Sequence, residues 1–214
     1  MNIKFFNVAL GLALTATALS ASAQKKYTEG TVNITTNMRG QEVNGKGYFR
    51  PDSNAFTFTA GPATIKILTD AGNKSMAILV DVPVASIKKA AIATPDEVDQ
   101  AQADMPVFTF APSTETKQIS GFNCKKVVAT DSKTKKTYDI WVTNDVVVPI
   151  TGIAKYYREI GGFPVQYTSF SQGQSTDVTV KSIVEEKAPA GTFGIPADFD
   201  KISLDDLKAM SGGR

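Results

Sequence analysis

The residues that could carry chemistry are few, because the 214-residue chain holds one cysteine, one tryptophan and no histidine. Both single copies, Cys124 and Trp141, fall in the stretch ISGFNCKKVVATDSKTKKTYDIWVT at 119–143. Without histidine no Ser-His or Cys-His pair can form, and one cysteine makes neither a Cys-x-x-Cys redox pair nor a thiolate metal cluster. No EF-hand or glycine-rich phosphate loop is recognisable. The sequence therefore predicts a non-enzymatic protein without a cofactor or a metal site.

Paired carboxylates are the remaining catalytic option, and they make a hydrolase the weakest of three function hypotheses. The pairs are Asp96-Glu97 and Glu185-Glu186. Adjacent acids in a strand point to opposite faces, and acids at a helix start interact favourably with the helix dipole. Both pairs are therefore better explained by structure than by catalysis.

The thiol of Cys124 would be reactive only if its pKa were depressed. In a strand, Lys125 points to the opposite face and Lys126 lies two residues along, so neither is well placed to lower that pKa. We expect a buried, structural cysteine, since free cysteine is among the most buried residue types. For Trp141 we expect a packed anchor, although an aromatic ring on a curved sheet can also contact a ligand.

The first 23 residues have the pattern of a cleaved export signal. Lys4 supplies the positive charge, an apolar stretch follows from Phe5 to Leu19, and Ala21-Ser22-Ala23 is a small-residue cleavage motif. The stretch is shorter than the roughly 20 residues that span a bilayer, and no cysteine follows it to carry a lipid anchor. We predict a signal peptide at 1–23, a single domain at 24–214, a periplasmic or secreted location, and no transmembrane segment in the mature chain. The net charge of +2 gives no basic field for nucleic acid or anionic lipid.

Alternating apolar and polar residues predict that strands dominate the mature chain. The alternation is clearest in TVNITTNM, AFTFTA, TIKILT and KSMAILV, which are joined by short connections. Such connections favour an antiparallel meander, because a parallel pairing needs a crossover of a dozen or more residues. Asn44-Gly45 predicts a tight turn that leads into a further strand around Tyr48 and Phe49, which ends at Pro51.

Helices are expected at three places. Thr94, Pro95 and Glu97 form a capping-box pattern that predicts a short helix from 95 onward. A turn or two of helix is expected around 153–160, and Ser203 is placed to cap a last short helix. Antiparallel strands with a few helices gathered on one side predict an α+β domain with a strongly curved sheet.

The stretch that holds Cys124 and Trp141 reads as a β-hairpin around the polar turn DSKTKK. If Thr130 pairs with Thr137, Cys124 lies opposite Thr143 and on the same face as Trp141. A register shift of one residue would reverse that arrangement, and the sequence leaves the register open.

Three segments, ISGFNCKK, YDIWVT and FGIPADFDKI, resemble an exported bacterial family of unknown function that shares the fold of the lipoprotein carriers and receptors LolA and LolB. The resemblance extends in outline from Tyr27 to about Ile202. It implies an open half-barrel: a curved antiparallel sheet whose concave face is covered by a few short helices and can enclose an apolar cavity. The residues that carry the resemblance are Gly121, Cys124, Trp141, Thr143, Phe193, Ile195, Pro196 and Asp198.

The leading function hypothesis is a periplasmic binding protein for an apolar ligand, either a lipid or an acylated lipoprotein. Such a ligand needs a pocket of roughly 300 Å³ or more, and the same residues could instead form an ordinary packed core. The alternative is an envelope scaffold that binds a protein partner through an exposed sheet edge or through the segment DVVVPITGIAKYY, without a lipid ligand. The predicted cavity walls are Val32, Ile34, Phe56, Phe58, Ile65, Ile67, Met76 and Ile78.

Overall fold

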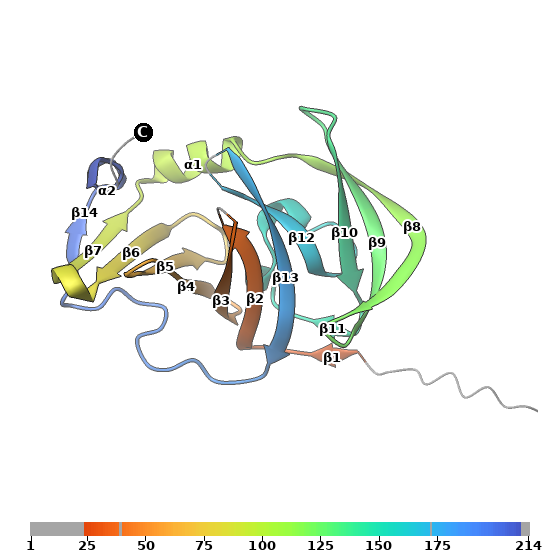
Figure 1. Cartoon of the computed structure of the whole chain (residues 1–214), viewed down its shortest axis with the longest axis horizontal. Helices are drawn as coiled ribbons and strands as arrows, with labels where there is room; N and C mark the ends of the chain where they lie inside the picture. The colour runs from red at the N-terminus through yellow and green to blue at the C-terminus, as the bar shows by residue number, and fades with distance from the viewer. Residues whose placement is uncertain (1–23, 39, 172, 211–214) are drawn as a thin grey trace, which may run out of the picture.

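The computed structural model describes residues 24–38, 40–171 and 173–210, so the predicted signal peptide at 1–23 lies outside the described residues. The fold is α+β, as predicted: a large curved sheet forms an open half-barrel, and short helices accompany it (Figure 1). Its strand order is β14-β7-β6-β5-β4-β3-β2-β13-β12-β10-β9-β8. Two further short strands, β1 (Lys25–Lys26) and β11 (Val146–Val147), pair in parallel beside it.

One half of the sheet is an antiparallel meander, which confirms the predicted topology. Neighbouring strands are antiparallel throughout this half. Strand β7 is an addition to the predicted strands, because its sequence has no clear alternation. A 3-10 turn, η1 (Pro83–Ala85), connects the last two strands. The strands are β2 (Gly30–Met38), β3 (Gln41–Arg50), β4 (Ser53–Ala60), β5 (Ala63–Asp70), β6 (Met76–Val82) and β7 (Ile87–Ile92).

The other half is also antiparallel and joins the first through the pairing of β13 with β2. At the edge of the first half, β14 (Asp200–Ile202) pairs in parallel with β7. Among the described residues, this pairing departs from the predicted antiparallel arrangement of the large sheet. The strands of this half are β8 (Phe108–Ile119), β9 (Phe122–Asp131), β10 (Thr137–Thr143), β12 (Phe163–Ser171) and β13 (Gln174–Val184).

The hairpin of β9 and β10 has the register in which Thr130 pairs with Thr137. Cys124 therefore lies opposite Thr143, and Trp141 lies opposite Lys126. The polar turn between the strands ends before Thr137, and regular pairing runs from Thr137 to the end of β10.

The predicted turn at Asn44-Gly45 is wrong, because both residues lie inside β3. The chain reverses earlier, between Met38 and Gln41, where Gly40 has a φ of +82°. Gly45 serves a different purpose: a Cβ at this position would lie 2.4 Å from Cζ of Phe56 on the neighbouring strand. The glycine is needed for close approach of an aromatic ring rather than for a left-handed backbone.

The helix predictions are largely confirmed. In α1 (Pro95–Ala103), the Thr94 side chain accepts from the Glu97 N–H, and the Glu97 carboxylate accepts from the Thr94 N–H. Ser203 precedes α2 (Leu204–Met210) and accepts from the Asp206 N–H at 3.0 Å. In place of the helix expected at 153–160, the chain forms two 3-10 turns, η2 (Ile150–Gly152) and η3 (Lys155–Tyr157).

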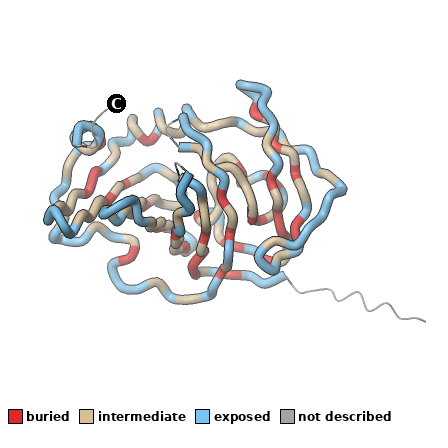
Figure 2. Tube along the Cα trace, viewed as in Figure 1, coloured by how far each residue is buried: buried red, intermediate tan, exposed pale blue. Residues whose placement is uncertain are grey.

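Buried residues follow the two faces of the curved sheet (Figure 2). We define the inner face as the face that carries Val32 and Ile34, and the segment 146–160 packs against it. We define the outer face as the face that carries Ala55 and Leu68. Residues 185–199, here termed the strap, pack against the outer face on their way to β14.

Candidate functional site

The predicted cavity walls share the inner face, as the strand register shows. Phe56 pairs with Ile67, and Ile67 pairs with Ile78. One row further along, Phe58 pairs with Ile65. Both rows continue across β3, where Gly47 lies beside Phe56 and Gly45 beside Phe58. On β2, Val32 then lies opposite Gly47, and Ile34 lies opposite Gly45. Met76, at the start of β6, pairs with Thr69.

Burial of this apolar row changes along the sheet. Val32 and Ile34 belong to the buried core, with Phe56 packed against it and the segment containing Val148 and Ile153 lying over it. The remaining side chains, on β4 to β6, are half-buried although they are large and apolar: Phe58, Ile65, Ile67, Met76 and Ile78. The inner face is therefore closed over β2 and β3 and more open over β4 to β6.

The strap closes the opposite side of the same strands. Phe193 and Ile195, two of the residues that carry the resemblance, are partly buried and pack against a buried outer-face cluster. The guanidinium of Arg50 lies 4.3 Å from the centre of the Phe193 ring. At the far end, the Asp198 carboxylate accepts a 2.6 Å hydrogen bond from Lys88 Nζ, and the Pro196 carbonyl accepts from the Phe199 N–H.

The hairpin residues of the pattern are also structural. Gly121 has a φ of +86° in the turn between β8 and β9, a conformation that favours glycine. Thr143 is almost fully buried, and its hydroxyl accepts from the Asp145 N–H at 3.0 Å. The Asp145 carboxylate in turn accepts from the Asn123 N–H at 2.7 Å. These contacts fix the end of the hairpin.

Cys124 is 2% exposed and packs in the core cluster that contains Val146 and Phe163. Burial, and then the negative charge of Asp145, raises the pKa of its thiol to about 11. A thiol with a raised pKa is protonated at neutral pH and is a poor nucleophile. These features favour the structural interpretation of this cysteine.

Trp141 is half-buried rather than enclosed. The Nζ of Lys117 lies 4.0 Å from the ring centre and donates a 2.9 Å hydrogen bond to Gln166, the residue paired with Trp141 on β12. The ammonium group of Lys117 therefore lies over the indole ring, where a ligand would otherwise make contact.

The segment proposed as a partner surface is divided between buried and exposed side chains. Val146 and Val148 are buried, whereas Val147 is 37% exposed and Ile150 is 52% exposed. Pairing of β11 with β1 turns alternate valines inward. Val147 and Ile150 are therefore the apolar side chains of this segment that are exposed to a protein partner, and Lys155 is exposed beside them.

One acid of each predicted pair has a structural contact. Glu97 caps α1, and Glu186 forms a 2.9 Å ion pair with Lys46. Within residues 24–38, 40–171 and 173–210, no group of three histidine, cysteine or acidic side chains could hold a metal ion.

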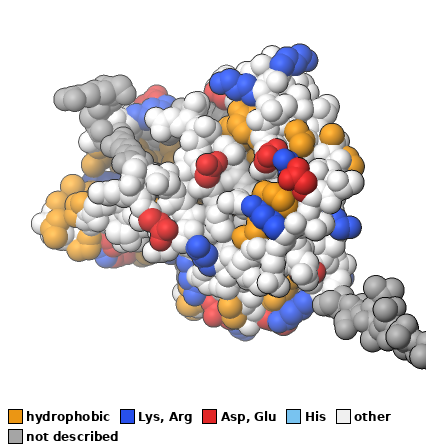
Figure 3. Space-filling view, turned by 45° about the vertical axis from the view of Figure 1, so that its right-hand side comes forward, with side chains coloured by type: hydrophobic (Ala, Val, Ile, Leu, Met, Phe, Trp, Pro, Cys, Tyr) orange, Lys and Arg blue, Asp and Glu red, His pale blue; other side chains and the backbone are white. Residues whose placement is uncertain are grey.

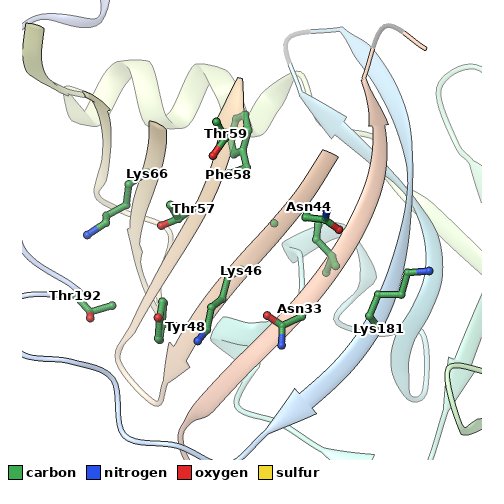
Figure 4. Close-up of a pocket in the computed structure, with 12 residues that line it drawn as sticks. Asn33, Asn44, Lys46, Tyr48, Thr57, Phe58, Thr59, Lys66, Lys181 and Thr192 are labelled. Carbon is green, nitrogen blue, oxygen red and sulfur yellow. The ribbon is translucent and has the colours of Figure 1, made fainter. Parts of the chain in front are cut away.

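Sequence reasoning missed two clefts on the outer face. One has a volume of about 620 Å³ and includes Lys46, Tyr48, Lys66 and Lys181 in its lining (Figure 4). The other, of about 400 Å³, lies along the strap and reaches Arg50. Of the predicted cavity walls only Ile34 and Phe58 line either cleft. A sequence signal for these clefts is absent, because they depend on where the strap crosses the sheet.

None of the helices in the described part of the chain is long and apolar enough to cross a membrane. Acidic and basic side chains are interspersed on the face shown in Figure 3 rather than gathered by sign.

No protein-family model matches the chain, and no curated protein matches its sequence. Two solved structures of PNGF-II, in the C2 and P21 space groups, are similar at 16% identity with TM-scores of 0.49 and 0.50. They cover 85% and 86% of this chain but only 32% and 33% of their own, so the chain spans about a third of the PNGF-II structures. At this identity the second match shows a shared fold and nothing about function. The resemblance to the lipoprotein carriers stays a prediction.

Proposed function

We propose that this is a non-enzymatic binding protein of the cell envelope that takes an apolar ligand, a lipid or the acylated end of a lipoprotein, on the inner face. The observation that carries the proposal is the half-buried apolar row over β4 to β6, in which Phe58, Ile65, Ile67 and Ile78 share one face.

Strands β4 to β6 differ in how their two faces are covered. On the outer face the same strands bury alanines and leucines under the strap, so the sheet is already anchored on that side. Large apolar side chains that remain only partly buried on the inner face of a curved sheet could complete their burial against an apolar ligand. Each methylene of an acyl chain buried there would contribute about 0.8 kcal/mol.

The location in the envelope is part of the proposal and rests on residues 1–23, whose charge, apolar stretch and cleavage motif are those of an export signal. The absence of an enzymatic role is likewise part of the proposal, supported by a buried cysteine with a raised pKa and by the structural contacts of Glu97 and Glu186.

A second candidate is an envelope scaffold, favoured by one observation: Val147 and Ile150 are large, apolar and exposed on the same segment. Photo-cross-linking from position 147 in intact cells tests it. Specific capture of one protein by a chain that carries no lipid would favour the scaffold over the lipid-binding function.

Substitution of Ile67 by glutamate tests the lipid-binding function directly. A charge in the centre of the apolar row should lower the affinity for a fluorescent acyl probe at least about tenfold, because a carboxylate is costly to bury without a partner. The matched control is Val84→Glu, since Val84 is 84% exposed on η1 and its substitution should leave binding unchanged. Equal affinity in wild type and Ile67→Glu, with both folded by circular dichroism, would contradict the proposal.

A further inference from the structure

Arg158 occupies an unusual position for an arginine in this fold. It follows η3 on the segment that packs against the inner face, and its Nη2 donates a 3.3 Å hydrogen bond to the Ala71 carbonyl. Ala71 directly follows β5, in the connection to β6. The guanidinium is thereby held at the end of the two strands that carry Ile65, Ile67 and Ile78.

The connection between β5 and β6 is held from two sides. Gln102 of α1 donates to the Asn73 carbonyl, and Lys155 donates to the side chain of Gln102. Helix α1, the β5–β6 connection and the η3 segment therefore meet around the position of Arg158. The last inner-face pair before this connection is Thr69 with Met76.

The charge of Arg158 is not neutralised within residues 24–38, 40–171 and 173–210, since no carboxylate there forms an ion pair with it. Its Nε is buried and has no hydrogen-bond partner among the same residues. Partial burial lowers the pKa of the guanidinium from its ordinary value, because desolvation disfavours the charged form. A buried polar group without a partner is destabilising, so such a group is a place to look for a ligand.

We infer that the ligand of the inner face is an anionic amphiphile whose carboxylate or phosphate head group pairs with Arg158 while its acyl chain lies along the apolar row. A planar guanidinium binds such groups through two parallel N–H donors, and charge-assisted bonds of this kind are stronger than neutral ones. The inference rests on the proposed function, because it names the class of ligand for the same face.

The test compares three twelve-carbon ligands by titration calorimetry of the purified protein: dodecanoate, dodecyl phosphate and uncharged 1-dodecanol. Wild type should bind at least one of the anions about tenfold or more tightly than the alcohol, a difference that one charge-assisted pair can supply. The tighter of the two anions identifies the head group as carboxylate or phosphate.

Arg158→Met should remove the preference for the anion and leave dodecanol binding within about twofold, and Arg158→Lys should restore part of the preference. Arg50→Met is the matched control, because Arg50 lies on the outer face with Asp52 and Phe193. This substitution should leave the affinities for all three ligands unchanged. Unfolding midpoints measured for each variant identify any loss of fold.

The possible failures are distinguishable. If none of the three ligands binds to wild type, the proposed function and the inference are both wrong. If all three bind wild type equally, or if the preference survives in Arg158→Met, the inference is wrong and apolar binding stands. An equal loss of all three ligands in Arg158→Met assigns Arg158 a purely structural role and also overturns the inference.

Discussion

At the scale of single residues, Cys124 is defined by its burial rather than by its chemistry. Because its pKa of about 11 lies above the ordinary value of 9.0, thiolate should be about 100-fold scarcer near pH 7 than for an ordinary thiol. Labelling of the native protein by a neutral thiol reagent should therefore be slow, and should become fast in denaturant. Fast labelling of the native protein near pH 6 would contradict the structural role.

The same raised pKa predicts a pH dependence of stability. The folded state holds the proton more tightly than the unfolded chain, so this contribution is fully present below pH 9 and is lost as pH rises toward 11. Between pH 8 and pH 11 the free energy of unfolding should fall more in wild type than in Cys124→Ala, as measured by urea titration. Parallel curves for the two proteins would show that the thiol pKa is unchanged on folding.

Ile140 and Trp141 are neighbours on β10 with opposite environments. Ile140 is fully buried, so Ile140→Ala should cost about 2–5 kcal/mol. A fully buried tryptophan would cost about 3–5 kcal/mol, but Trp141 is half-buried and Trp141→Ala should cost less than that. Denaturant titration of both variants measures the difference, and a larger cost for Trp141→Ala would show that the ring is more deeply packed than described.

At the scale of elements, β3 and β4 fit together because a glycine faces an aromatic ring. Gly45→Ala would place a Cβ 2.4 Å from Phe56 Cζ and should destabilise the protein by about 1–3 kcal/mol. Gly47→Ala, on the same face of the same strand, meets Phe56 only at 3.6 Å and should be nearly neutral. A double-mutant cycle with Phe56→Leu should show coupling to position 45 and little to position 47. Equal effects of the two alanines would exclude the close contact as the cause.

These elements differ in how far the sequence predicts them. The β9–β10 hairpin was predictable because apolar and polar residues alternate on both sides of a polar turn, but its register was not, because the length of that turn was open. The prediction of a turn at Asn44-Gly45 was wrong, because a glycine can be required either by a left-handed backbone or by a close neighbouring side chain. Which of the two applies depends on the facing strand, and the local sequence does not show it. Strand β7 was missed because Lys88, Lys89, Ala90 and Ala91 break the apolar alternation.

At the scale of the whole molecule, local patterns predict the curved α+β sheet but not what covers it. The eight predicted wall residues do share a face, because each strand keeps its period of two. Two properties depend on long-range packing and have no local signal: the clefts beside the strap, and the position of Arg158 at the end of β5 and β6. For the same reason the sequence could not separate a packed core from an open apolar face.

The central claim is that the apolar face over β4 to β6 binds an acyl chain. Native mass spectrometry of the protein purified from its own envelope fraction, followed by lipid extraction, tests this most directly. We predict a stoichiometric acyl-bearing species on wild type, retained in Val84→Glu and lost in Ile67→Glu. Wild-type protein that carries no acyl species and remains at its bare mass after incubation with excess lipid would contradict the claim.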